Sequence, residues 1–370
     1  MVYSLNEYYT TDRILSKPAE YYISIGNRCN GKTTAWCIHL IDEYFKNGGQ
    51  FGKLERTGFI GNDSIYLSWF TDYAQNYLKE KYNHYIEVIG HNYYLVDYDD
   101  EYLPLERNQK RARKNYKPFG RTFSLGLEVK YKSTEYPAIT TLIFEEFTLI
   151  NQWGYLDHEV DHFLSLLSTV NRNRTNLKVV LIGNTISKYN PYFELLGIKI
   201  NKLNLKQGDI ADLQDRTYKN GARIRIEFAE SIYSKDEEAP RILQVGGNEI
   251  AVTGDFARTQ YIVDDEYDNF IFNECKPVCK LAIKHESKMY YLLQCYYKET
   301  DFYFITNRGR QYKSSGLIYA IDLEVIECIK QGVKTRFDLY KQLQELQINN
   351  ILYSDEDIEY KVNELLTKCK

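Results

Sequence analysis

Apolar residues in the first half of the chain fall into short continuous runs at residues 21–25, 138–144 and 177–182. Runs of this length, rich in β-branched and aromatic residues, are typical of strands buried on both faces of a parallel sheet. Apolar residues with helical spacing follow at residues 35–44 and 157–170. Strands that alternate with helices predict an α/β fold with a mostly parallel sheet. A hairpin is also expected, with strands at 85–89 and 93–96.

The pattern changes in the second half. Residues 203–218 predict a polar connecting helix, and residues 224–226 a short strand. Three successive strands are expected at 279–285, 289–295 and 302–306, followed by helices at about 323–346 and 354–368. Strands in succession and then helices suggest a small α+β domain resembling ribonuclease H. We therefore expect three parts: a first domain at 1–202, a connecting segment at 203–249 and a C-terminal domain at 250–370.

Composition favours a soluble globular protein, with 44% hydrophobic and 26% charged residues. No apolar run approaches the length that spans a bilayer, and Met1-Val2-Tyr3-Ser4 opens no signal peptide, so we expect an intracellular protein without membrane contact. The seven cysteines are scattered. Cys275 and Cys279 form the closest pair but lack the second pair of a zinc site, which favours reduced thiols.

Charge limits how this chain meets nucleic acid. The formal net charge is -4, so any contact with DNA must come from local basic patches. A dense basic run at 107–121 fits either a loop that grips phosphates or a solvated insertion. Lys130 and Lys132 form a second, shorter candidate patch.

The strongest motif lies between the first strand and the first helix. Gly26-Asn27-Arg28-Cys29-Asn30-Gly31-Lys32-Thr33-Thr34 fits G-x-x-x-x-G-K-[ST], the phosphate-binding loop. Glycines let backbone N–H groups converge on a phosphate, and the start of the helix adds its dipole. Lys32 is expected on the β and γ phosphates, and the Thr33 hydroxyl on magnesium. A strand before the motif and a helix after it predict an ATP and magnesium site.

Two acids follow the strand at 138–144. Glu145 is expected to hold magnesium, usually through water, and Glu146 to activate the attacking water. Asn184, at the end of the next buried strand, is a candidate sensor of the γ-phosphate. Arg172 and Arg174 close the preceding helix. Either fits an arginine finger that reaches a neighbouring subunit, and both also fit a solvated basic helix end.

His158-Glu159-Val160-Asp161-His162 satisfies the zinc motif H-E-x-x-H. A zinc protease also needs a third ligand, and the chain has only six histidines. The helix lies between two buried strands of the predicted sheet, and its histidines lie opposite the apolar face. Coincidence is the favoured interpretation.

Several segments resemble the DNA-packaging (encapsidation) ATPases of phi29-like podoviruses, small relatives of the large terminase motors. The resemblance is carried by the phosphate loop with its arginine, the acidic strand at 140–147, Lys132-Ser133 with Tyr136-Pro137, and the stretches 169–174, 181–184 and 190–193. It covers roughly residues 13–195. The C-terminal half matches only in size and general plan.

The resemblance implies a P-loop ATPase of the additional-strand type in a ring, as a homopentamer docked on the portal of a procapsid in the host cytoplasm. It implies that Arg172 is the finger in trans and Glu146 the catalytic glutamate, and that Lys132, with Lys130 beside it, lies on a loop lining the DNA channel. It further implies a nuclease-like C-terminal fold without nuclease activity. In agreement, residues 279–285, 289–295 and 302–306 contain no acid, although Asp301 borders the last run.

Glu145 departs from the family pattern, which has Asp at this position. The sequence thus favours an ATP-driven translocase that packages double-stranded viral DNA. It leaves open whether a packaging RNA joins motor and portal. Rival hypotheses are a helicase or conjugation ATPase, a non-enzymatic assembly module controlled by nucleotide, and a zinc metalloprotease.

Overall fold

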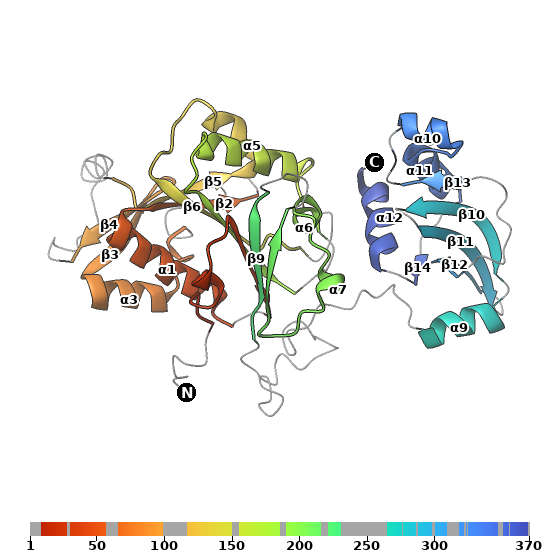
Figure 1. The fold of residues 1–370 in the computed structure, drawn as a ribbon, viewed down its shortest axis with the longest axis horizontal. Coiled ribbons are helices and arrows are strands. Elements are labelled where there is room, and N and C mark those ends of the chain that lie inside the picture. The colour runs from red at the N-terminus through yellow and green to blue at the C-terminus, as the bar shows by residue number, and fades with distance from the viewer. Residues whose placement is uncertain are drawn as a thin grey trace. The chain divides into compact units, whose positions relative to one another are not determined.

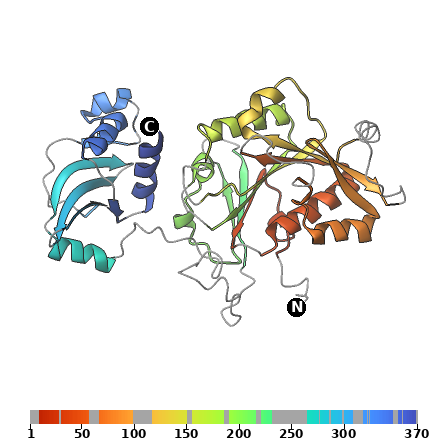
Figure 2. The ribbon, with the colours of Figure 1, turned by 180° about the vertical axis from the view of Figure 1, so that it is seen from behind.

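A computed structural model of the 370-residue chain describes residues 9–27, 30–56, 66–98, 117–149, 155–185, 190–215, 221–230, 265–275, 277–285, 288–297, 300–308, 318–321, 323, 325–346, 351–354 and 356–368. The chain divides into two compact units, residues 1–257 and 258–370 (Figures 1 and 2). Among the described residues, no helix has the length and apolar character needed to cross a membrane.

A large, mostly parallel sheet forms the first unit (Figure 1). Its strand order is β3-β4-β5-β2-β6-β7-β1-β9-β8. The strands are β1 (Tyr21–Gly26), β2 (Gln50–Glu55), β3 (His84–Ile89), β4 (Asn92–Asp97), β5 (Gly120–Ser124), β6 (Ile139–Glu145), β7 (Lys178–Asn184), β8 (Ile210–Gln214) and β9 (Arg223–Phe228). The six strands from β5 to β9 in this order run parallel, and β7 lies between the phosphate-loop strand β1 and the acidic strand β6. This arrangement confirms the predicted α/β fold with an additional strand.

Two helical layers cover this sheet (Figure 2). Helices α1 (Lys32–Asn47) and α3 (Asp72–Tyr82) bury Trp36, Leu40 and Leu78 against one face. Helix α5 (Glu159–Asn171) packs Phe163 and Leu166 against the other, beside the 3-10 helix η3 (Leu125–Tyr131). Short helices η2 (Ile14–Ser16), α6 (Pro191–Leu195) and α7 (Ile200–Leu203) complete the unit. Each strand of the centre is thus buried on both faces, as its continuous apolar sequence predicts.

The prediction of a helix at 203–218 is wrong. Residues 210–214 form β8, which pairs antiparallel with β9, while β9 pairs parallel with β1. Residues of the expected connecting segment 203–249 therefore belong to the first sheet. Strand β8 is a polar edge strand in which only one face meets the core, so it lacks the apolar run that marks a central strand.

The second unit has a sheet of order β13-β10-β11-β12-β14 within the described residues. Strands β10 (Val278–His285), β11 (Lys288–Tyr297) and β12 (Thr300–Thr306) are antiparallel neighbours, as predicted. Short strands β13 (Ile318–Ala320) and β14 (Ile351–Tyr353) add a parallel edge on each side. The helices are α9 (Asp265–Glu274), α10 (Val325–Gln331), α11 (Arg336–Glu345) and α12 (Glu356–Lys368). The three antiparallel strands followed by helices match the expected α+β plan, whereas α9 before the strands and β14 between α11 and α12 were not expected.

One long helix was expected at 323–346, but the chain forms α10 and α11 there. Gly332 has a φ of 66°, which ends the first helix in the left-handed region. Thr335 begins the second: its hydroxyl accepts from the Asp338 backbone N–H, and the Asp338 carboxylate accepts from the Thr335 N–H. The capping box therefore divides the helical pattern.

Candidate active site

The phosphate loop connects β1 to α1 at the carboxyl end of the parallel strands. Gly31 has a φ of 88°, a conformation that favours glycine, and Lys32 is the first residue of α1. The buried Lys32 amine donates to the Asn27 carbonyl at 2.6 Å and to the Asn30 Oδ1 at 3.0 Å. At Gly26 an added Cβ would lie 3.2 Å from the Ala229 carbonyl oxygen. The backbone at the end of β1, where the loop begins, therefore packs closely against the backbone of Ala229. The predicted residues Arg28 and Cys29 lie outside the described part of the chain.

Thr33 and Glu145 meet although 112 residues separate them. The Thr33 hydroxyl donates to Glu145 Oε1, and the Trp69 indole N–H donates to Glu145 Oε2 at 2.7 Å. Thr34 hydrogen-bonds the hydroxyl of Thr71, the N-cap of α3, at 3.1 Å. Trp69 was missed by sequence reasoning because its segment carries no motif.

This donor set fits magnesium. A threonine hydroxyl and a carboxylate in direct contact supply the oxygen ligands that Mg²⁺ prefers, and a phosphate-bound ion keeps several waters besides. The extra methylene of Glu145, relative to Asp, does not remove its carboxylate from Thr33. The fit therefore supports Thr33 and Glu145 as the pair that would hold the ion.

Glu146 is the first residue after β6 and has a φ of 53°, in the left-handed region. This turn takes its side chain out of the strand, and the residue is exposed. Asn184 ends β7 and lies in register with Gly26 of β1. The Thr148 hydroxyl donates to the Asn184 carbonyl at 2.9 Å. The turn after β6 and the end of β7 therefore lie at the same sheet edge as the phosphate loop.

The two candidate finger arginines have different surroundings. The Arg174 guanidinium donates to the carbonyls of Pro137, Ile139 and Val170 at 2.6 to 2.9 Å, and burial lowers the pKa of this group. Arg172 is the C-cap of α5, and its side chain is 38% exposed. Because Arg172 is exposed and Arg174 is only partly exposed, Arg172 is the better candidate for a contact in trans.

Arg172 contacts the segment that carries the candidate DNA-binding residues. Its guanidinium pairs with Glu135 at 2.7 Å and donates to the Lys132 carbonyl at 3.0 Å. Lys130, at the end of η3, and Lys132, just after it, are both exposed. Most of the basic run at 107–121 lies outside the described residues.

The zinc interpretation finds no support. His158 pairs with Asp161, and His162 Nδ1 lies 3.2 Å from Glu128 Oε2. Glu159, the general base of a zinc protease in that motif, is buried and ion-paired with Arg56. No group of three or more metal-ligating side chains occurs among the residues that the structure describes.

Burial governs the titration of groups around the site. Burial, with the charge of Glu159 next in importance, holds the pKa of Tyr192 well above its usual range. Burial also raises the pKa of Tyr155 to about 12 and that of the Cys37 thiol well above its ordinary value. Cys37, Cys275, Cys295 and Cys328 are buried free thiols, as expected of structural cysteines.

The profile of the Podovirus DNA encapsidation protein (Gp16) family matches residues 3–233 of the 370 in the chain. The chain belongs to this family. The DNA packaging protein of Bacillus phage B103 is 32% identical over 198 residues, which cover 52% of this chain and 51% of that protein. The DNA packaging protein of Bacillus phage phi29 is 27% identical over 187 residues, covering 50% and 49%. The match thus spans about half the length of these curated relatives.

The similarity in fold to solved structures covers more of the chain than the match in sequence does. A chain from the bacteriophage Phi-29 viral genome packaging motor assembly is similar with a TM-score of 0.57 at 19% identity, covering 98% of this chain and 99% of that chain. A chain of the Phi-28 gp11 DNA packaging motor gives a TM-score of 0.55 at 17% identity, covering 99% and 98%. These similarities establish the fold of the chain across both units.

Proposed function

We propose that this chain is an ATPase whose hydrolysis of ATP drives double-stranded viral DNA into a procapsid. Membership of the encapsidation family supports the substrate, and the relatives named above are DNA packaging proteins. The observation that carries the enzymatic part is the contact between the Thr33 hydroxyl and the Glu145 carboxylate, with Lys32 and Glu146 beside them in the chain. A loop lysine, a magnesium pair and a second acid are the parts of ATP hydrolysis.

Each residue has a role in this proposal. The N–H groups of residues 26–34 and the Lys32 amine bind the phosphates, with Lys32 exchanging the Asn27 carbonyl and Asn30 for phosphate oxygens. Thr33 and Glu145 would hold magnesium, and the ion would supply positive charge to the phosphates. Glu146 accepts a proton from the attacking water, and the Asn184 amide contacts the γ-phosphate region.

The ring and its partners are also part of the proposal. Arg172 from one subunit completes the site of the next in a homopentamer, and Lys130 and Lys132 contact DNA phosphates, which carry no sequence information. The similarity in fold to a chain from a viral packaging motor assembly supports such a ring. We place the ring in the host cytoplasm, docked transiently on the procapsid portal.

The test is the ATPase rate with and without double-stranded DNA, for wild type and Arg172→Ala, at a concentration that favours assembly. We expect DNA to stimulate wild-type turnover. Arg172→Ala should lower the DNA-stimulated turnover about 1000-fold, because a finger stabilises charge in the transition state. Arg223→Ala is the matched control, since Arg223 is also an exposed arginine paired with a glutamate, Glu20. Turnover indifferent to DNA and to Arg172 would leave an NTPase but refute the packaging motor.

A further inference from the structure

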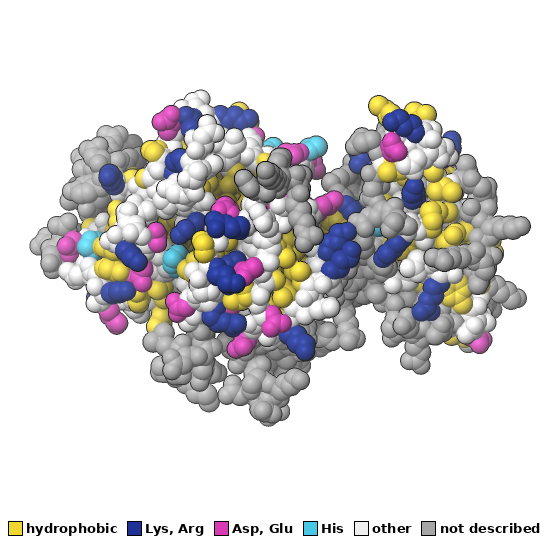
Figure 3. Space-filling model, in the orientation of Figure 1, with side chains coloured by type: hydrophobic (Ala, Val, Ile, Leu, Met, Phe, Trp, Pro, Cys, Tyr) yellow, Lys and Arg dark blue, Asp and Glu magenta, His cyan; other side chains and the backbone are white. Residues whose placement is uncertain are grey.

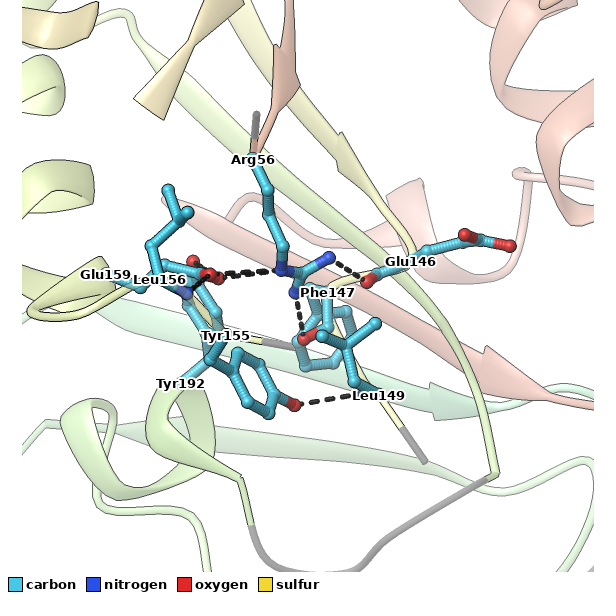
Figure 4. Close-up of polar contacts among 8 residues, drawn as sticks. All are labelled: Arg56, Glu146, Phe147, Leu149, Tyr155, Leu156, Glu159 and Tyr192. Atoms are coloured by element: carbon cyan, nitrogen blue, oxygen red, sulfur yellow. Dashed lines mark hydrogen bonds and ion pairs between the residues drawn. The ribbon is translucent and has the colours of Figure 1, made fainter. Parts of the chain in front are cut away.

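The turn that carries Glu146 is held by a largely buried arginine, Arg56, that no sequence motif marks. Arg56 follows β2, the strand beside β6, and its side chain is 12% exposed. One terminal nitrogen donates to the Glu146 carbonyl at 2.6 Å and the other to the Phe147 carbonyl at 2.8 Å. Figure 4 shows the guanidinium between this turn and the start of α5, with the Glu146 carboxylate pointing away from it.

The Glu159 carboxylate accepts from the remaining donor of the Arg56 guanidinium, Nε. Both of its carboxylate oxygens lie 3.0 to 3.1 Å from Arg56 Nε. The carboxylate also accepts from the Tyr192 hydroxyl at 2.6 Å and from the Leu156 N–H at 2.9 Å (Figure 4). Glu159 is 3% exposed. Because Glu159 and Phe147 are buried and three groups accept from the guanidinium, Arg56 has one well-defined position.

Aromatic rings also restrict this guanidinium. Its central carbon lies 4.8 Å from the centroid of the Phe144 ring and 5.0 Å from that of Tyr155. An arginine offers donors in a rigid planar fork and stacks on aromatic faces, whereas a lysine offers one compact charge. Two successive carbonyls, a carboxylate and two rings therefore form a site that arginine alone satisfies.

The backbone that Arg56 holds is unfavourable by itself. Glu146 has a φ of 53°, and side-chain-bearing residues adopt this region only when the surroundings impose it. Pairing of β6 with β7 holds Glu145 just before the turn, and the bonds to the Glu146 and Phe147 carbonyls fix the two peptide planes that follow Glu146. The direction of the Glu146 side chain follows from those planes.

We infer that Arg56, held by Glu159, is a positioning residue that fixes the turn after β6 and so aims the Glu146 carboxylate at the attacking water. The inference rests on the proposed role of Glu146 as the residue that activates water. Glu159 is also the first residue of α5, the helix capped by Arg172 at its other end. One helix therefore joins the support of the proposed base to the proposed finger.

The test separates positioning from simple stabilisation of the fold. Arg56→Lys keeps the charge near Glu159 but loses the fork. We expect kcat for DNA-stimulated ATP hydrolysis to fall about 10- to 100-fold, as misplacing a catalytic group does, with KM and the Kd of a fluorescent ATP analogue within about twofold of wild type. Glu159→Gln retains shape and the contact with Tyr192, and should lower kcat in the same selective way.

Arg225→Lys is the matched control, because Arg225 is another buried arginine with an acidic partner, Asp212, but lies on β9. We expect it to lower the Tm and leave kcat near wild type. Should Arg56→Lys lower only the Tm, as Arg225→Lys does, the inference is overturned. If Arg56→Lys fails to fold, Glu159→Gln decides on the same criteria.

A second single variant distinguishes failure of the inference from failure of the proposed function. If Glu146 acts as proposed, Glu146→Gln abolishes turnover. Full turnover in Glu146→Gln would refute the role of Glu146 itself. Loss in Glu146→Gln together with an unchanged kcat in Arg56→Lys would refute only the positioning role.

Discussion

At the residue scale, both oxygens of the Glu145 carboxylate have a partner, one in the phosphate loop and one outside any motif. One oxygen accepts from the Thr33 hydroxyl, and the other accepts from the Trp69 indole. Trp69 is 7% exposed and packs against Phe51 and Phe70, so its N–H is held in place by the core. The indole therefore orients the carboxylate that is proposed to hold magnesium.

Trp69→Phe removes this donor and keeps an aromatic ring. Loss of a hydrogen bond that orients a metal ligand should raise the Mg²⁺ concentration for half-maximal ATP hydrolysis about tenfold. The measurement is turnover titrated with magnesium at saturating ATP. Trp36→Phe is the matched control because the Trp36 indole donates to Ser24 instead, at 3.1 Å. Identical magnesium curves for the two variants would contradict an orienting role for Trp69.

At the element scale, the sequence predicts best what is buried most. Strands β1, β6 and β7 follow from their apolar runs because both of their faces are covered. The edge strand β8 does not, and a helix was expected in its place. The site divides in the same way: local motifs predict Lys32 and Thr33, whereas Arg56 and Trp69 reach it through tertiary contacts that no spacing encodes.

Helix α5 illustrates how tertiary contacts give one element several roles. The sequence marks its apolar face and its terminal arginines, but it also suggests zinc ligands. In the structure Glu159 pairs with Arg56 at one end, and Arg172 pairs with Glu135 at the other. Helix α5 also packs along η3, next to the segment with Lys132. The proposed finger and the proposed DNA contact thus share one packed unit.

Breaking the pair at the C-terminal end of α5 tests this connection. Arg172 has to leave Glu135 to reach a neighbouring γ-phosphate under the proposed function. Glu135→Gln should therefore raise the DNA-independent ATPase rate about two- to fivefold and reduce the stimulation by DNA, a change consistent with an exposed ion pair worth about 1 kcal/mol or less. The assay is turnover with and without DNA at assembling concentrations.

Glu20→Gln is the control for this variant, because it breaks an exposed arginine–glutamate pair of the same kind, with Arg223, far along the chain. A basal rate in Glu135→Gln equal to that of wild type and of this control would show that the pair does not restrain Arg172.

At the scale of the whole molecule, charge is mixed and the net value is small. The formal net charge is -4, and on the face seen in Figure 3 basic and acidic side chains lie interspersed over the first unit. A field of this kind does not draw DNA to a whole face. Affinity for DNA must then depend on a few local phosphate contacts, for which the exposed Lys130 and Lys132 are the proposed residues.

A dependence on few contacts has a measurable consequence. The logarithm of the DNA-binding constant falls linearly with the logarithm of salt concentration, with a slope set by the number of phosphates neutralised. Lys132→Ala should reduce that slope by about 1 per contributing subunit and weaken binding equally for DNA of any sequence. The measurement is fluorescence anisotropy with mixed-sequence duplexes over a range of salt. Lys46→Ala is the control, since Lys46 is an exposed lysine on α1, which covers the opposite face of the sheet from η3. If both variants keep the wild-type slope, Lys132 makes no phosphate contact, and the DNA-binding surface lies elsewhere on the molecule.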